Sequence, residues 1–85
     1  GPRSDVDVMT PAEKADDNSD LAALGQFVRQ HRLAAGLTQE GLADVAGLHW
    51  TYVSDVERGR RNPTYRVIRQ LARALGVAPG DLFPS

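Results

Sequence analysis

Residues 39–58 carry the pattern that most constrains the fold, because two short helical stretches meet there at Gly47. Glycine readily takes the left-handed backbone conformation that ends a helix, so the chain can turn sharply at this point. Apolar and small residues recur at helical spacing on both sides of the turn. They are Leu42, Ala43, Ala46, Leu48, Val53 and Val56. The pattern predicts two short helices that meet at a fixed angle and each bury one face.

The second of these helices, expected at residues 50–58, leaves a polar face exposed. Four residues share this face because 3.6 residues complete one helical turn. They are Trp50, Thr51, Ser54 and Asp55. A helix of roughly nine residues is about 13 Å long, which suits a DNA major groove about 12 Å wide. A short exposed helix held by its partner at a fixed angle therefore predicts DNA binding.

Charge is unevenly distributed along the chain. Residues 1–20 hold two cationic and six acidic side chains, a net of -4, whereas residues 21–85 hold eight arginines against five acidic side chains, a net of +3. Six of these arginines lie within sixteen residues, and such a concentration is typical of a surface that binds phosphate. They are Arg58, Arg60, Arg61, Arg66, Arg69 and Arg73. A solvated helix face would carry the same charges, so charge alone leaves both interpretations open.

The first 19 residues are acidic and polar, with little apolar periodicity. Such a segment buries too little apolar surface to offset its chain entropy, so we expect a disordered, flexible tail. Gly1 and Pro2 have the form of a scar left by tag removal. The sequence has no cysteine, no signal peptide and no apolar run of membrane-spanning length, so a cytoplasmic protein with no membrane contact is expected.

Residues 20–84 predict one all-α domain of five helices. The first is expected from near Asp20 to Ala35, with Leu21, Leu24, Val28, His31 and Ala35 turned inward. Thr38 and Thr64 are N-caps for the second and fourth helices, which end at Gly47 and Gly76. Pro79 suits the first turn of a short fifth helix over residues 79–83.

These residues resemble the phage-repressor-like (Cro/CI, or XRE) helix-turn-helix family, over residues 21–83. The segments that carry the resemblance are GlyLeuThrGln (36–39), LeuAla (42–43), AlaGly (46–47), TyrValSerAspValGluArgGly (52–59), ArgAsnPro (61–63) and LeuAlaArgAlaLeuGlyVal (71–77). The resemblance implies a compact five-helix lambda-repressor-like DNA-binding domain. In that fold residues 39–58 form the helix-turn-helix unit, and residues 50–58 are the recognition helix.

The resemblance also implies roles for individual residues. The base-reading side chains would be Trp50, Thr51, Ser54 and Asp55, and the phosphate contacts would be Gln39, His49, Tyr52, Arg58, Arg60, Arg61, Thr64 and Tyr65. Arg32 and Glu57 would form a structural ion pair between the first and third helices. The reading face has no Arg, Gln or Asn, the usual partners of guanine and adenine. Alternatively, Trp50 would pack against the turn, and His49 would cap the third helix.

The function predicted from these features is sequence-specific binding of double-stranded DNA in transcription regulation, by a bacterial or phage-type, nucleoid-associated protein. A homodimer formed through the fifth helix, with Leu82 and Phe83, would bind an inverted-repeat operator. The alternative is a protein-interaction module or antitoxin that keeps the fold. Restriction–modification controllers, phage-type repressors and antitoxins all remain open. With two histidines and no glycine-rich phosphate loop, we expect no enzyme activity, cofactor, metal or small-molecule ligand.

Overall fold

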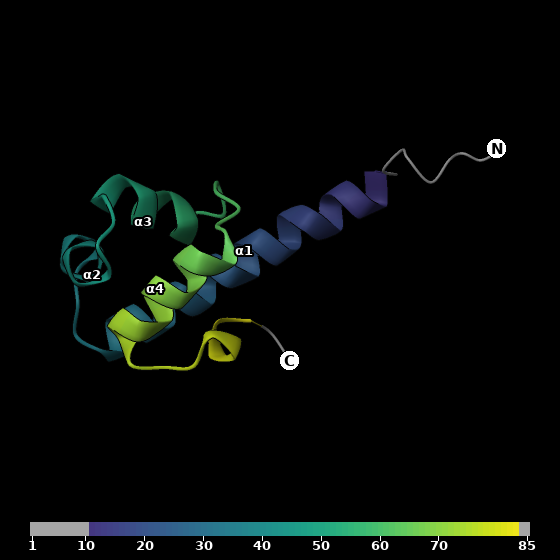
Figure 1. Cartoon of the computed structure of the whole chain (residues 1–85). Coiled ribbons are helices and arrows are strands. Elements are labelled where there is room, and N and C mark those ends of the chain that lie inside the picture. The colour runs from purple at the N-terminus through teal and green to yellow at the C-terminus, as the bar shows by residue number, and fades with distance from the viewer. Residues whose placement is uncertain (1–10, 84–85) are drawn as a thin grey trace.

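The computed structural model describes residues 11–83 of the chain, with side chains for residues 20–83. Its elements, in order, are α1 (Pro11–Ala34), α2 (Gln39–Ala46), α3 (Trp50–Glu57), α4 (Tyr65–Leu75) and the 3-10 helix η1 (Pro79–Leu82) (Figure 1). Residues 11–83 contain no strand, and the prediction of an all-α domain is confirmed. The expected fifth helix is present as one short 3-10 segment rather than an α-helix.

The α1 helix begins earlier than the sequence analysis expected. It starts at Pro11 rather than near Asp20, so residues 11–19 of the expected tail are helical. Residues 1–10 of that tail lie outside the described residues. The sequence carries a signal for this start, because proline favours the first helical position and Thr10 and Glu13 have capping-box spacing. The prediction missed it because it relied on apolar periodicity, and Figure 1 shows that these turns project beyond the other helices.

The α2 and α4 helices are bounded by the expected capping residues. The hydroxyl oxygen of Thr38 accepts a 2.9 Å hydrogen bond from the amide of Gly41 at the start of α2. The hydroxyl oxygen of Thr64 accepts one of 3.3 Å from the amide of Val67 at the start of α4. Gly47, which ends α2, has a φ of 73°, the left-handed conformation that most side chains disfavour. The sequence predictions of the bounds of α2 and α4 are therefore confirmed.

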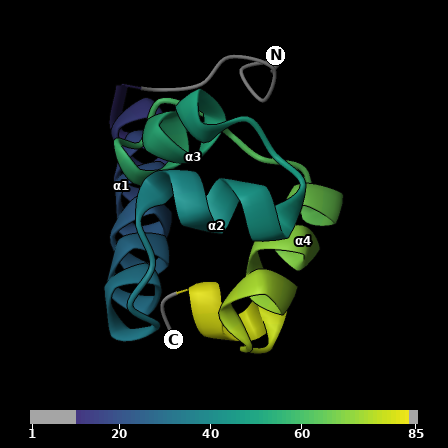
Figure 2. The same ribbon diagram turned by 90° about the vertical axis from the view of Figure 1, so that its left-hand side faces the viewer.

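The core lies where all five elements meet. Figure 2 shows α2 and α3 at an angle to each other, with α1 and α4 on either side. The buried apolar residues are Leu24, Val28, Leu42, Ala43, Ala46, Val53, Val56, Ile68, Leu71, Ala72 and Leu82. Of the expected inward residues of α1, Leu21 and His31 are half-buried and Ala35 is exposed. Ala35 follows the last residue of α1, so the helical spacing does not carry it to the core.

Leu82 does not lie on the surface, as the expected dimer contact requires. It is 0% exposed within one chain, because η1 packs against both α1 and α4. An apolar side chain that fills the core of its own domain is unavailable to a partner unless the domain opens. The expectation that Leu82 forms part of a dimer surface is therefore wrong, whereas the neighbouring Phe83 is 45% exposed.

The α1 and α3 helices approach closely at Gly25. A Cβ atom added there would lie 2.5 Å from the carbonyl oxygens of Val56 and Glu57, closer than any ordinary contact. Those oxygens belong to the backbone of α3, so they cannot move without displacing the helix. Glycine at position 25 therefore sets the distance between α1 and the end of α3.

We predict that Gly25→Ala destabilises the domain even though alanine is the better helix former by about 1 kcal/mol. Overpacking at a backbone contact costs about 1–3 kcal/mol, and displacement of α3 adds to that cost. Urea unfolding measures the change in the free energy of unfolding. Gly80→Ala is the matched control, because a Cβ atom there meets nothing within 4 Å. Equal stability of the two variants would contradict the inferred contact.

Candidate nucleic-acid interface

The end of α3 is attached to α1 by a buried ion pair. The Nε atom of Arg32 donates to Oε2 of Glu57 at 2.6 Å, and its Nη2 atom donates to Oε1 at 3.0 Å. The two side chains are 10% and 4% exposed. The hydrogen bond to Glu57 raises the pKa of Arg32, burial opposes this, and the charge of Glu57 adds to it, so the guanidinium group stays charged. The residues thus form the structural pair that the family resemblance implied.

Gln39 connects the start of α2 to the same carboxylate. Its Nε2 atom donates to Oε1 of Glu57 at 3.1 Å. The third hydrogen-bond donor of Arg32, Nη1, binds the carbonyl oxygen of Leu37 at 2.9 Å, just before α2. Glu57 is therefore the point at which α1, α2 and α3 are joined. An amide nitrogen has two hydrogens, so Gln39 keeps one for a further acceptor.

Three of the four expected base-reading residues reach the surface, and one does not. Trp50 is 47% exposed, Thr51 is exposed and the side chain of Asp55 is 33% exposed. Ser54 is only 7% exposed, so the expectation that it faces outward is wrong. Residues three apart are neighbours on a helix surface, and Ser54 lies one turn from the buried Glu57. Trp50, one turn before Ser54 at the start of α3, is exposed instead.

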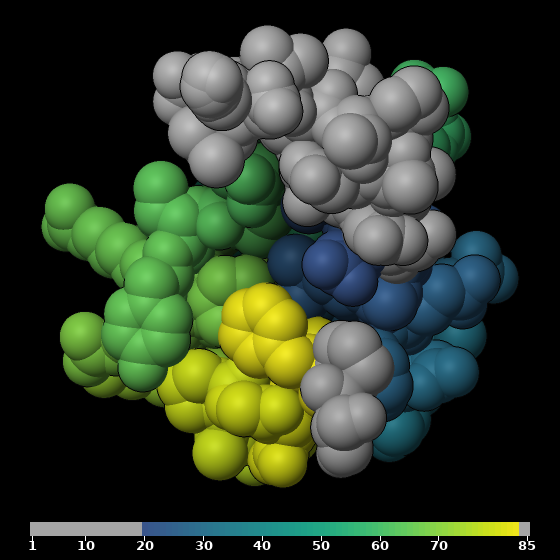
Figure 3. Space-filling model, turned by 90° about the vertical axis from the view of Figure 1, so that its right-hand side faces the viewer, coloured from purple at the N-terminus to yellow at the C-terminus, as the bar shows by residue number. Residues whose placement is uncertain are grey.

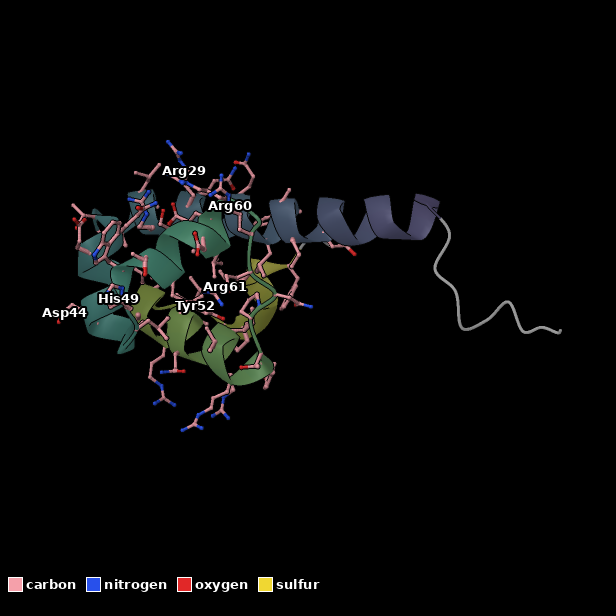
Figure 4. The ribbon with its side chains drawn as sticks, turned by 90° about the horizontal axis from the view of Figure 1, so that it is seen from above. Arg29, Asp44, His49, Tyr52, Arg60 and Arg61 are labelled. Carbon is pink, nitrogen blue, oxygen red and sulfur yellow. The ribbon has the colours of Figure 1, made fainter. Side chains whose placement is uncertain are left out.

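His49 caps α3, as its alternative role predicted. Its Nδ1 atom accepts a 3.2 Å hydrogen bond from the amide of Thr51 and lies 2.7 Å from the Thr51 hydroxyl oxygen. The imidazole also stacks beside the indole of Trp50, with ring centroids 6.4 Å apart and an interplanar angle of 25°. Figure 4 shows His49 at the end of α3 that adjoins α2. One side chain thus contacts both residues that begin the reading face.

Arg61 lies against α3 although it belongs to the loop that follows. Its guanidinium carbon is 5.3 Å from the ring centroid of Tyr52, and its Nε atom is 3.6 Å from Oδ2 of Asp55. Figure 4 shows Arg61 and Tyr52 together in the view onto α3. The exposed side of α3 therefore gains a guanidinium that its own sequence lacks. Sequence spacing could not place Arg61, because the path of the loop determines where it lies.

The six clustered arginines do not form one patch. Arg58, Arg60 and Arg61 are exposed at the end of α3 and in the loop after it. The other three line a separate open groove of about 480 Å³ between α2 and α4. Its lining residues are Val45, Ala46, Arg66, Arg69, Gln70, Arg73 and Ala74. The charge pattern left open whether the six form one phosphate-binding surface, and the structure divides them into two groups because the arginines of α4 face a groove beside α2.

The remaining expected phosphate contacts lie at the start of α4 and are exposed. Thr64 is its N-cap, and Tyr65 is 65% exposed in its first turn. A helix N-terminus favours anions, so this position has suitable polarity for a phosphate. Arg29, on α1, is also exposed, and Figure 4 shows it at the same edge of the molecule as Arg60. Arg29 belongs to no motif, so the sequence pattern gives no signal for it.

The geometry of α2 and α3 is that of a helix-turn-helix, and comparison with known proteins agrees. The family model described as "Helix-turn-helix domain" matches residues 23–84. The chain belongs to this helix-turn-helix family. The resemblance to phage-repressor-like regulators is thereby confirmed. None of the helices in the described part of the chain is long and apolar enough to cross a membrane.

Several relatives of this helix-turn-helix protein are control proteins. It is 51% identical to control protein C.BamHI of Bacillus amyloliquefaciens over 60 residues, which cover 69% of this chain and 74% of the relative. It is 44% identical to control protein C.SmaI of Serratia marcescens over 60 residues, 71% of each chain. The crystal structure of the restriction-modification controller protein C.AhdI from Aeromonas hydrophila superposes with a TM-score of 0.75 at 48% identity. That match covers 76% of this chain and 98% of C.AhdI.

We predict that Glu57→Ala lowers the free energy of unfolding by roughly 3–5 kcal/mol, because it leaves Arg32 charged and buried without its partner. Asp55→Ala, which breaks the exposed pair with Arg61, should cost no more than about 1 kcal/mol. Urea unfolding of both variants measures the difference. The double variant Arg32→Met/Glu57→Leu should recover much of the lost stability, since no buried charge remains unpaired. Equal losses for Glu57→Ala and Asp55→Ala would contradict the structural role.

Proposed function

We propose that this helix-turn-helix transcriptional regulator binds an inverted-repeat operator in double-stranded DNA as a homodimer, with α3 of each copy in the major groove. The observation that carries the proposal is the placement of α3. Its far end is anchored through the buried Glu57, while its first turn exposes Trp50 and Thr51. Anchoring one end and exposing the other leaves a rigid helix that can enter a groove.

Base reading is proposed for Trp50, Thr51 and Asp55. Thr51 can contact a thymine methyl or a polar base edge, and Asp55 can accept from the amino group of cytosine. Arg61, beside Tyr52, partly neutralises the negative charge of Asp55. This reduces repulsion between that carboxylate and DNA phosphates. Ser54 is left out of this set because its side chain is buried.

Phosphate binding is proposed for residues on α3 and around it. They are Gln39, His49, Tyr52, Arg58, Arg60, Arg61, Thr64 and Tyr65. Gln39 donates to Glu57 at the end of α3, and the three arginines and the start of α4 follow that end in the chain. Contacts with phosphates fix the register of a recognition helix without reading sequence themselves.

Control of restriction–modification genes is the biological role that we propose. The support is the similarity to C.BamHI, C.SmaI and C.AhdI, all of which bear the name of control or controller proteins. The proposal involves binding rather than catalysis, and it places the protein in the cytoplasm, on the DNA of the nucleoid. An operator found upstream of restriction or modification genes would agree with this role.

The homodimer is proposed to form around Phe83 rather than Leu82. Phe83 is 45% exposed and lines a hollow of about 330 Å³ with residues of α1, the loop before α4 and α4 itself. Figure 3 shows this face, with the C-terminal residues in yellow between α1 in blue and α4 in green. A two-fold dimer would present two recognition helices about 34 Å apart, one turn of DNA.

We predict that Phe83→Asp raises the dissociation constant of the dimer roughly 10-fold or more, because an exposed aromatic side chain is a typical anchor of an interface. Sedimentation equilibrium measures the change. Leu33→Asp is the matched control. Leu33 is an apolar residue of α1 that is 55% exposed and does not line the hollow beside Phe83. If Phe83→Asp and wild type dimerise equally well, the dimer does not use this face.

We predict that Arg60→Ala/Arg61→Ala weakens operator binding roughly 10-fold or more, because each hydrogen bond to a charged group contributes about 1.5–3 kcal/mol. The slope of log K against log salt should become shallower by roughly 0.9 for each lost phosphate contact. Arg69→Ala/Arg73→Ala removes the same charge from the groove on α4 and should change affinity much less. Unchanged affinity in Arg60→Ala/Arg61→Ala would instead favour a protein-interaction module.

A further inference from the structure

The hydrogen bonds around His49 determine where the hydroxyl hydrogen of Thr51 lies. The Nδ1 atom of His49 has two polar neighbours, both from Thr51: the amide nitrogen at 3.2 Å and the hydroxyl oxygen at 2.7 Å. A backbone amide can only donate, so Nδ1 must be the acceptor and carries no hydrogen. The neutral imidazole then has its hydrogen on Nε2.

The same reasoning applies to the hydroxyl group of Thr51. Two atoms 2.7 Å apart form a hydrogen bond only if one of them supplies a hydrogen. Nδ1 has none, so the hydroxyl group of Thr51 donates to the single lone pair of Nδ1, which the hydroxyl shares with the Thr51 amide in a three-centre hydrogen bond. A hydroxyl group has one hydrogen, so the exposed side of Thr51 retains lone pairs and a methyl group but no donor. Thr51 therefore faces the surroundings of α3 as an acceptor.

We propose that His49 is a positioning residue that sets the base preference of Thr51. The inference rests on the proposed function, in which the start of α3 lies in the major groove. With its hydrogen bound to His49, the Thr51 hydroxyl can accept from an exocyclic amino group of adenine or cytosine, and it cannot donate to N7 or O6 of guanine. A threonine whose hydroxyl rotates freely can both accept a hydrogen bond from an amino group and donate one to N7 or O6 of guanine. His49 thus converts an unselective side chain into one that selects for an amino group.

The stacking of His49 beside Trp50 supports this assignment. A centroid separation of 6.4 Å lies within the range in which aromatic rings attract each other. The imidazole thus has a ring contact with Trp50 in addition to the two hydrogen bonds at Nδ1. Because the imidazole is held in this way, it keeps Nδ1 directed at Thr51.

The test uses the full chain and the operator that selection from a random duplex library recovers. Thr51→Val, which removes the hydroxyl and keeps the shape, first identifies the base that Thr51 contacts. At that base, the amino group is replaced by hydrogen in one duplex, and N7 of the purine of the same pair is replaced by carbon in another. Wild-type affinity should fall roughly 3- to 10-fold on loss of the amino group, the scale of one hydrogen bond, and should not respond to loss of N7.

Two variants of His49 then separate positioning from capping. His49→Asn places an acceptor oxygen near the position of Nδ1, so it should retain the sensitivity to the amino group. His49→Leu removes the acceptor and frees the hydroxyl, so that sensitivity should disappear. Loss of the cap alone lowers affinity for every duplex by the same factor. In the Thr51→Val background, His49→Leu should have no further effect on the base preference.

Each remaining outcome overturns the inference in a distinguishable way. If wild-type protein enriches no DNA site, the proposed function fails and the inference fails with it. If a site is enriched but Thr51→Val changes no base preference, or His49→Leu keeps the wild-type preference, the inference alone is overturned. A preference in His49→Asn that matches His49→Leu rather than wild type also contradicts the role of Nδ1.

Discussion

The arrangement of this domain depends on the carboxylate of Glu57. It accepts hydrogen bonds from Arg32 of α1 and from Gln39 of α2 while it belongs to α3. A charged group that is 4% exposed is tolerated only if its hydrogen-bonding capacity is satisfied, so the three helices must meet in one geometry. Gly25 permits the close approach that brings Arg32 within reach. The orientation of α3, on which DNA recognition depends, follows from this contact.

Electrostatics explains why an overall negative chain can be a DNA-binding protein. Its formal net charge is -1, but the acidic residues are concentrated in residues 1–20. Within the folded part, Arg58, Arg60 and Arg61 remain exposed beside α3, whereas the arginines of α4 line a groove elsewhere. Local charge rather than net charge governs phosphate binding over distances of about one Debye length. The two groups of arginines are therefore available for different contacts.

The first turn of α3 shows how neighbouring side chains change what a residue can recognise. Thr51 taken alone is both a donor and an acceptor, and Asp55 taken alone would repel DNA. In the structure, Nδ1 of His49 lies 2.7 Å from the hydroxyl oxygen of Thr51, and Arg61 lies beside Asp55. The specificity of such a surface is a property of pairs of residues, so a list of exposed positions does not describe it.

The sequence by itself determined the class of fold, the bounds of α2 and α4, and the pairing of Arg32 with Glu57, because helical periodicity, caps and family motifs are local or shared signals. Apolar periodicity did not show that α1 starts at Pro11, because no apolar face marks the helix there and the signal lies in the proline and the capping-box spacing. Only the tertiary structure decided that Ser54 and Leu82 are buried, that Arg61 lies on α3 and that the arginines of α4 lie apart. Burial and proximity depend on how helices pack and where loops run, and neither is encoded in the spacing of residues along one helix.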